Sequence, residues 1–258
     1  MCSDPDSTPP IEPGASSSAH GQRVVLTAAD GAAMATYRAD ASEPTGAGII
    51  VLPDYYGLTS FYEDLALRFA EAGIDAIAID YYGRTARPPP RDASFDHVHH
   101  ADRTTWTGLQ TDVAAAANEL RSERRVRALF SIGFCFGGRT SFLLGTVSEL
   151  DLAGVIGFYG WPVGEFRNDT PAPAAVTSDL RVPLLGIFGE ADPKIPPTDV
   201  GAFESALEAA PTPHRVISYE GAPHSFFDRK QESHGEASAA AWSEVLGFIE
   251  ADRSAPGI

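Results

Sequence analysis

The hydrophobic pattern of this chain alternates between short apolar runs typical of strands and longer amphipathic runs typical of helices. The first two strand-like runs flank an Ala-Asp-Gly turn, which predicts an antiparallel pair. A capping box joins Ser60 to Glu63 at the start of one helix, and Gly73 stands where a left-handed cap would end it. The predicted strands are 23–27, 33–38, 48–52, 76–79, 126–133, 153–158, 182–188 and 215–219, and the predicted helices are 60–72, 106–120, 137–149, 198–209 and 238–250.

This alternation of strands and helices predicts an α/β fold with a mostly parallel central sheet and helices on both faces. The chain has 258 residues, of which 43% are apolar, and this size suits a single domain, expected over residues 23–253. Residues 1–22 are rich in Pro, Ser, Gly and Asp, so we expect them to form a flexible tail. The polar segment 84–102, rich in Arg and Pro, predicts a long loop that forms a functional rim.

The charge of the chain is strongly negative, because 19 basic residues against 35 acidic residues give −16. A charge of this sign repels polyanions at long range and leaves no basic stripe, which argues against nucleic acids and anionic membranes as partners. The apolar runs are all far shorter than the ~18 residues of a membrane-spanning segment. We therefore expect a soluble, cytoplasmic protein, and we expect it to be a monomer.

One cysteine stands out as a candidate for chemistry. Cys2 lies in the predicted tail and Cys135 in an apolar context, so we expect no structural disulfide. Cys135 is the centre of Gly-Phe-Cys-Phe-Gly-Gly, between a predicted strand and a predicted helix. This is the form of a G-x-S-x-G nucleophile elbow with Cys in place of Ser, in which Gly133 and Gly137 let strand and helix approach each other. The alternative interpretation is an ordinary buried cysteine before a glycine-rich turn.

An acid and a histidine follow the cysteine in the chain order that such an elbow requires. Asp192 comes just after the predicted strand 182–188, and His224 lies in a tight loop after the last predicted strand. Glu190 is a weaker alternative for the acid. In this hypothesis His224 transfers a proton, Asp192 fixes its tautomer, and Cys135 attacks a carbonyl as a thiolate.

Two backbone N–H groups are candidates for an oxyanion hole. One belongs to Phe136 at the start of the helix after the cysteine, and the other to Tyr55 in the loop after the strand 48–52. Asp54 precedes Tyr55 and would lie near the thiol. The histidines at positions 97, 99 and 100 lack a recognisable ligand spacing, so we interpret them as part of a solvated loop and expect no metal site.

The chain contains the motifs GFCFGG, LPDYYG, DYYGR, FYG, GEAD and GAPHSF. With these motifs it resembles the dienelactone hydrolase (carboxymethylenebutenolidase) family of the α/β-hydrolase superfamily over nearly all of residues 23–250. The resemblance implies that the thiol attacks an enol-lactone or activated ester, that an acyl-enzyme forms, and that water releases a carboxylic acid, with no cofactor or metal. It also implies that Asp54 stands where a family glutamate contacts the thiol and Arg84 where a family arginine binds a substrate carboxylate. Asp228 stands where the family has a second arginine.

The substrate-binding residues have two interpretations. Arg84 is either a carboxylate-binding group or a surface arginine of its loop. Six aromatic residues either wall an apolar pocket or belong to the core: Tyr55, Tyr82, Phe136, Tyr159, Trp161 and Phe226. The leading hypothesis is a hydrolase of small lactones or esters. The alternatives are a hydrolase of other esters or thioesters, and a small-molecule-binding or thiol redox-sensing protein without hydrolytic activity.

Overall fold

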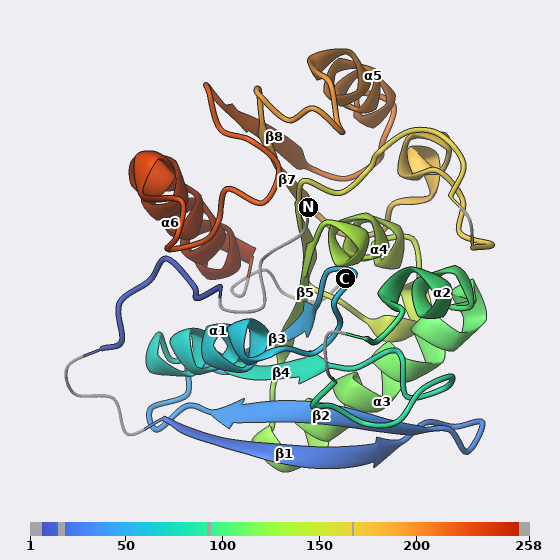
Figure 1. Cartoon of the computed structure of the whole chain (residues 1–258), viewed down its shortest axis with the longest axis vertical. Helices are drawn as coiled ribbons and strands as arrows, with labels where there is room; N and C mark the ends of the chain where they lie inside the picture. The colour runs from blue at the N-terminus through green and yellow to red at the C-terminus, as the bar shows by residue number, and fades with distance from the viewer. Residues whose placement is uncertain (1–6, 15–18, 92–93, 167, 253–258) are drawn as a thin grey trace.

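A single eight-stranded sheet organises the computed structural model, which describes residues 7–14, 19–91, 94–166 and 168–252 (Figure 1). The strand order is β1-β2-β4-β3-β5-β6-β7-β8. β1 and β4 pair antiparallel with β2, and all the other neighbours pair parallel. The strands are β1 (His20–Thr27), β2 (Ala33–Asp40), β3 (Ala47–Leu52), β4 (Asp75–Ile79), β5 (Ala128–Phe134), β6 (Gly154–Phe158), β7 (Leu184–Gly189) and β8 (His214–Tyr219).

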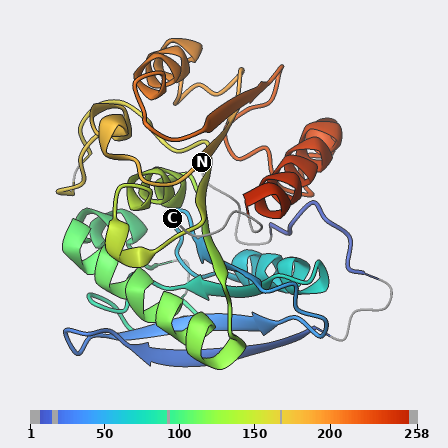
Figure 2. The ribbon, with the colours of Figure 1, turned by 180° about the vertical axis from the view of Figure 1, so that it is seen from behind.

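Helices cover both faces of this sheet, with α1 and α6 on one side and α3 and α4 on the other (Figures 1 and 2). Every residue of β3 to β7 is buried, as expected for parallel strands covered on both faces. The predicted mostly parallel α/β architecture is therefore confirmed. The helices are α1 (Ser60–Glu71), α2 (His97–Asp102), α3 (Trp106–Arg124), α4 (Phe136–Leu144), α5 (Pro197–Leu207) and α6 (Gly235–Asp252).

Helix α1 begins and ends close to the predicted positions. Its N-cap residue is Thr59, which makes no side-chain capping hydrogen bond, so the predicted Ser60 capping box is wrong. Gly73 has a φ of 81°, and its N–H donates to the carbonyl of Ala70 at 3.1 Å. The glycine therefore ends the helix in the left-handed conformation that the sequence indicated.

Helix α2 lies inside the segment predicted to be a loop, residues 84–102. Asp96 caps it by accepting a hydrogen bond from the N–H of His99 at 3.0 Å. The helix has six residues and only Ala101 buried. A helix this short has no apolar period to detect, so hydrophobic patterning missed it.

Residues 7–14 lie against the domain, although this segment was predicted to be part of a flexible tail. Ser7 is buried, and its hydroxyl donates to the carboxylate of Asp228 at 2.6 Å. The backbone N–H of Arg229, which follows Asp228, donates to the carbonyl of Thr8 at 2.9 Å. The segment therefore has tertiary partners that composition does not reveal, and β1 begins at His20 rather than at residue 23. The rest of the predicted tail, 1–6 and 15–18, lies outside the described residues, as do 92–93 and 253.

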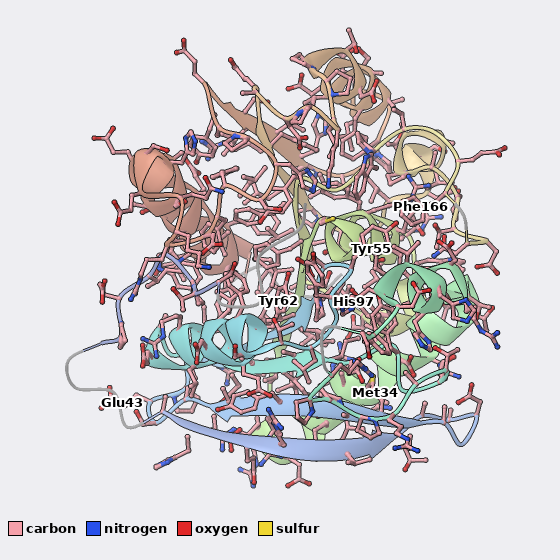
Figure 3. All side chains as sticks on the ribbon, in the orientation of Figure 1. Met34, Glu43, Tyr55, Tyr62, His97 and Phe166 are labelled. Carbon is pink, nitrogen blue, oxygen red and sulfur yellow. The ribbon has the colours of Figure 1, made fainter. Side chains whose placement is uncertain are left out.

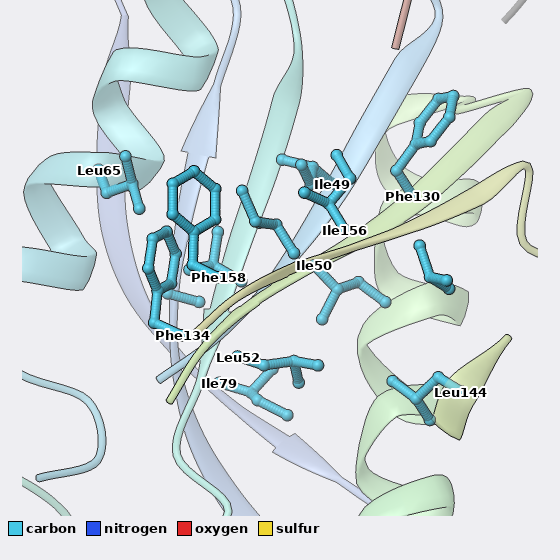
Figure 4. Packing of buried hydrophobic residues seen from close by; sticks show 14 of the residues in the cluster. Ile49, Ile50, Leu52, Leu65, Ile79, Phe130, Phe134, Leu144, Ile156 and Phe158 are labelled. Atoms are coloured by element: carbon cyan, nitrogen blue, oxygen red, sulfur yellow. The ribbon is translucent and has the colours of Figure 1, made fainter. Parts of the chain in front are cut away.

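The hydrophobic core joins the central strands to the helices on both faces. Figure 4 shows β-strand residues such as Ile50, Phe134 and Phe158 packed together, with Leu65 of α1 on one side and Leu144 of α4 on the other. This packing holds β3, β5, β6 and β7 in parallel register, so the loops after their carboxyl ends gather at one edge of the sheet. Within the described residues, no helix is long and apolar enough to cross a membrane.

Candidate active site

Cys135 occupies a sharp turn between strand β5 and helix α4. Its φ of 56° and ψ of −112° lie outside the conformations that L-residues favour, and its side chain is fully buried. Its N–H donates to the carbonyl of Phe158 at 3.0 Å, and its carbonyl accepts from the N–H of Arg139 at 3.1 Å. Strained conformations of this kind persist where surrounding structure enforces them, and they concentrate at functional sites.

The glycines around Cys135 are required by close backbone contacts. A Cβ at Gly133 would overlap the carbonyl of Gly137, and one at Gly137 would overlap the carbonyl of Leu52 on β3. A Cβ at Gly138 would lie 2.5 Å from the carbonyl of Phe158. The strand and the helix can therefore meet at this angle only without side chains at Gly133 and Gly137, as the elbow motif predicted, and Gly138 allows a similar approach to β6.

Asp192 and His224 come together at the same edge of the sheet. His224 Nδ1 lies 2.6 Å from Asp192 Oδ2, and both side chains are buried. The other carboxylate oxygen accepts from the N–H groups of Lys194 at 2.8 Å and Ile195 at 3.3 Å. Glu190, the alternative acid, is exposed. The Asp192 carboxylate thus contacts the His224 imidazole through one oxygen and is fixed by two backbone N–H groups through the other.

The loop after β6 supplies the aromatic surroundings of His224. The ring of Tyr159 lies 5.0 Å from the imidazole, and the ring of Trp161 lies 5.3 Å from it. Tyr159 has a φ of 37°, and its N–H donates to the carbonyl of Ile187 at 2.7 Å. Two of the predicted pocket aromatics therefore flank the histidine.

The loop after β3 places Asp54 in a buried network of tyrosines. The Asp54 N–H donates to the hydroxyl of Tyr62 at 3.0 Å, and the hydroxyl of Tyr81 donates to the Asp54 carbonyl at 2.8 Å. Burial raises the pKa of Tyr81 well above its ordinary value, and the charges of Asp54 and Cys135 raise it further. A Cβ at Gly137 would overlap the carbonyl oxygen of Pro53, so the loop that carries Asp54 runs directly beside the elbow.

The two residues predicted to form the oxyanion hole lie side by side. The rings of Tyr55 and Phe136 are 5.4 Å apart. Phe136 is the first residue of α4, and N–H groups in the first turn of a helix have no acceptor within that helix. The structure therefore brings the loop after β3 and the start of α4 together beside Cys135.

Arg84, which was predicted to bind a substrate carboxylate, is paired in the structure with two carboxylates of the protein itself. Its guanidinium donates twice to Asp112 of α3, at 3.0 and 2.8 Å, and also to Asp30 in the turn between β1 and β2. These carboxylates raise the pKa of Arg84. The sequence could not show this pairing, because α3 and the β1–β2 turn bring two acids to the loop that carries Arg84 only in the folded chain.

Tyr82 and Phe226, which were predicted to bind substrate, are fully buried. The hydroxyl of Tyr82 donates to the carbonyl of Tyr55 at 2.8 Å, so Tyr82 supports the loop from behind. Phe226 packs on the rings of Tyr159 at 5.9 Å and Tyr219 at 5.6 Å. Both residues therefore belong to the core that supports the site, and neither is an exposed pocket wall.

A surface pocket of about 410 Å³ opens beside Trp161. Tyr55 and Phe166 form part of its wall, and Figure 3 shows how they lie relative to His97 and Tyr62. Of the lining residues, only Tyr55 and Trp161 were predicted from the sequence. The position of the Trp-Pro-Val-Gly-Glu-Phe segment directly after the FYG motif is the signal that could have identified Val163, Glu165 and Phe166. The lining is Tyr55, Val98, Trp161, Val163, Glu165, Phe166 and Lys194.

Arg139 is a second residue that sequence reasoning missed. It lies one helical turn after Cys135, is almost fully buried, and donates to backbone carbonyls of the segment 161–171. Its guanidinium carbon is also 5.1 Å from the centre of the Phe166 ring. Burial lowers the pKa of Arg139 to about 10. The accepting carbonyls belong to Trp161 at 2.9 Å, Gly164 at 3.2 Å, Thr170 at 3.5 Å and Pro171 at 2.8 Å.

Replacing Arg139 with methionine is expected to loosen the pocket wall. Methionine fills similar space but cannot donate, and a buried carbonyl left without a donor costs about 1–3 kcal/mol. We expect urea unfolding to show a loss of about 3 kcal/mol and hydrogen exchange to increase in residues 161–171. Arg139→Lys, which keeps some donors, should lose less. Wild-type stability and exchange in the methionine variant would contradict this role.

The histidines of α2 contact aromatic and hydroxyl groups. His97 packs on Tyr56 with ring centres 4.7 Å apart, and His100 stacks on Phe95 at 4.5 Å. His100 Nδ1 also lies 2.9 Å from the hydroxyl of Thr85. In the part of the chain that the structure describes, no group of three or more His, Cys, Asp or Glu side chains is placed to hold a metal ion.

The fold of this chain is the α/β-hydrolase fold. A candidate dienelactone hydrolase from Klebsiella pneumoniae subsp. pneumoniae superposes with a TM-score of 0.79 at 24% identity, over 90% of this chain and 99% of that one. A dienelactone hydrolase-like promiscuous phosphotriesterase from metagenomic libraries superposes with a TM-score of 0.72 at 22% identity, over 91% of this chain and 98% of that one. At these identities the likeness concerns the fold alone.

The chain belongs to the dienelactone hydrolase family, whose model matches residues 34–252. The carboxymethylenebutenolidase of Rhodococcus opacus is 30% identical over 220 residues, which cover 81% of this chain and 84% of that protein. Family membership makes the protein a hydrolase of lactones or esters. The matched range spans the elbow and the loops that carry Asp54, Asp192 and His224.

Proposed function

We propose that this protein hydrolyses small lactones and activated esters through an acyl-enzyme on Cys135. The observation that supports this most strongly is the buried pair of Asp192 and His224, 2.6 Å apart, at the edge of the sheet where β5 turns into α4 at Cys135. A carboxylate that holds Nδ1 of an imidazole selects the tautomer in which Nε2 can accept a proton.

In the proposed first half of the reaction, His224 Nε2 takes the proton of the Cys135 thiol. The thiolate attacks the carbonyl carbon, a C–S bond forms, and the carbonyl π electrons move to the oxygen. The N–H groups of Phe136 and Tyr55 stabilise that oxyanion. When the carbonyl forms again the C–O bond breaks, and the leaving oxygen takes the proton from His224.

In the second half, water attacks the thioester carbonyl and gives a proton to His224. The C–S bond then breaks, the carboxylic acid leaves, and the proton passes from His224 to the thiolate sulfur. Asp54 is proposed to be the carboxylate that acts on the resting thiol, because it is buried in the loop beside the elbow. In this scheme Asp192 stays ionised and stabilises the imidazolium in both halves.

Mass spectrometry can detect the acyl-enzyme intermediate after an acid quench has trapped it. After brief incubation with a panel of enol-lactones and 4-nitrophenyl esters and an acid quench, we expect an acyl adduct on the peptide that contains Cys135. Cys135→Ala should lose both the adduct and the turnover, because alanine offers no nucleophile. Cys2→Ala is the matched control and should keep both.

Two outcomes would go against the proposal. Undiminished turnover in Cys135→Ala would show that another group attacks the substrate. Oxidation of Cys135 by peroxide, together with no adduct and no turnover for any member of the panel, would favour the redox-sensing alternative.

A further inference from the structure

We infer that the pocket beside Trp161 takes uncharged esters or lactones that carry a flat aromatic group, and that it excludes carboxylate-bearing substrates. This inference rests on the proposed function and names the substrate class of that site. It depends on two features of the described residues: how the pocket wall is built, and where the nearby cationic side chains are bound.

Three aromatic rings form one wall of the pocket. The Tyr55 and Phe166 rings are stacked, with centres 6.1 Å apart and planes 23° apart. The Trp161 ring lies 6.0 Å from Phe166 and 6.3 Å from Tyr55. Rings at such distances pack well with a further flat apolar group. Trp161 also lies 5.3 Å from the His224 imidazole, so a group bound on this wall adjoins the proposed chemistry.

Four arginines from the elements around the pocket have partners outside it. Arg84 is paired with Asp112 and Asp30, and Arg91 donates twice to the buried carboxylate of Asp80, at 2.8 and 2.7 Å. The guanidinium of Arg229 contacts the carbonyl of Ile11 at 3.2 Å and the carboxylate of Glu12 at 3.3 Å. Arg139 donates to carbonyls behind the wall. No arginine is among the described residues that line the pocket.

The charges that do line the pocket oppose each other. Lys194 brings one positive charge and Glu165 one negative charge. The ammonium of Lys194 lies 5.9 Å from the centre of the Trp161 ring, where a cation–π contact holds it. The whole chain carries −16, so its field repels anions. A substrate carboxylate would lose its hydration on an apolar wall without a bidentate partner, which is costly.

Lys194 is the one cationic residue among the described lining residues of the pocket. Its exposed side chain could pair with an anion if it left the Trp161 ring. The decisive comparison therefore uses two ligands of the same shape that differ in charge, and it tests both with and without this lysine.

The experiment measures binding separately from turnover. In Cys135→Ala, titration followed by tryptophan fluorescence compares 4-hydroxybenzamide with 4-hydroxybenzoate, which have nearly the same shape. We expect the neutral amide to bind about tenfold more tightly or better. Phe166→Leu, added to this variant, should weaken amide binding several-fold because it keeps an apolar side chain but removes the ring.

The same comparison is then made on turnover. With wild-type protein, kcat/KM for 4-acetoxybenzamide, corrected for its hydroxide-catalysed rate, should exceed that for 4-acetoxybenzoate about tenfold. Lys194→Gln should keep this order. If no ester is hydrolysed the proposed function fails, but the binding comparison still decides the inference.

The inference is overturned if the carboxylate ligand binds as tightly as the amide or more tightly. Loss of that carboxylate binding in Lys194→Gln would then identify the lysine as an anion site. Failure of both ligands to bind would also overturn it, since the wall would then not hold an aromatic group.

Discussion

Replacing Asp192 with asparagine is expected to lower kcat about 10³- to 10⁴-fold while the fold is retained. The carboxylate now accepts a hydrogen bond from His224 Nδ1 at 2.6 Å, and its other oxygen accepts from the Lys194 N–H at 2.8 Å. An asparagine can keep the oxygen on the Lys194 side and turn its NH₂ toward the imidazole. Nδ1 would then have to accept, so the proton would move to Nε2 and the imidazole could no longer take the thiol proton.

The measurement is kcat for an activated ester across the pH range, together with thermal unfolding of each variant. Glu190→Gln is the matched control, because Glu190 was the competing acid and is exposed two residues away. It should keep kcat within a few-fold. A normal kcat in Asp192→Asn, or an equal loss in Glu190→Gln, would refute the assigned role of Asp192.

Replacing Gly137 with alanine is expected to destabilise the protein strongly. The new Cβ would overlap the backbone carbonyl of Leu52 and crowd that of Pro53. The Leu52 carbonyl cannot turn aside, since β3 is held in register between β4 and β5. We expect a loss of about 4 kcal/mol or more in the free energy of unfolding, or failure to accumulate folded protein.

Denaturant unfolding measures this loss, and Gly201→Ala is the matched control. Gly201 lies within α5, and a Cβ there would meet no atom within 4 Å. Alanine favours the helix over glycine by about 1 kcal/mol, so this variant should be as stable as wild type or more so. Equal stability of Gly137→Ala and wild type would mean that strand and helix approach less closely than described.

The sequence by itself determined the architecture and the local geometry of the elbow. Strands β3 to β7 are continuous apolar runs because parallel strands are buried on both faces, and such runs can be recognised without coordinates. Gly133 and Gly137 could be assigned because their role is local, on either side of one turn. Cys135, Asp192 and His224 could be proposed as a triad because each follows a strand whose carboxyl end lies at a known edge of the sheet.

Only the tertiary structure decided which partners the long polar side chains and the segments of irregular structure have. Arg84 turned toward Asp112 and Asp30, and residues 7–14 docked on Asp228, through contacts between positions far apart in the sequence. The carbonyls that Arg139 binds belong to a segment with no hydrophobic period. Hydrophobic patterning reports which face of an element is buried, whereas the pairing of a charge depends on which distant groups the folded chain brings within hydrogen-bonding distance.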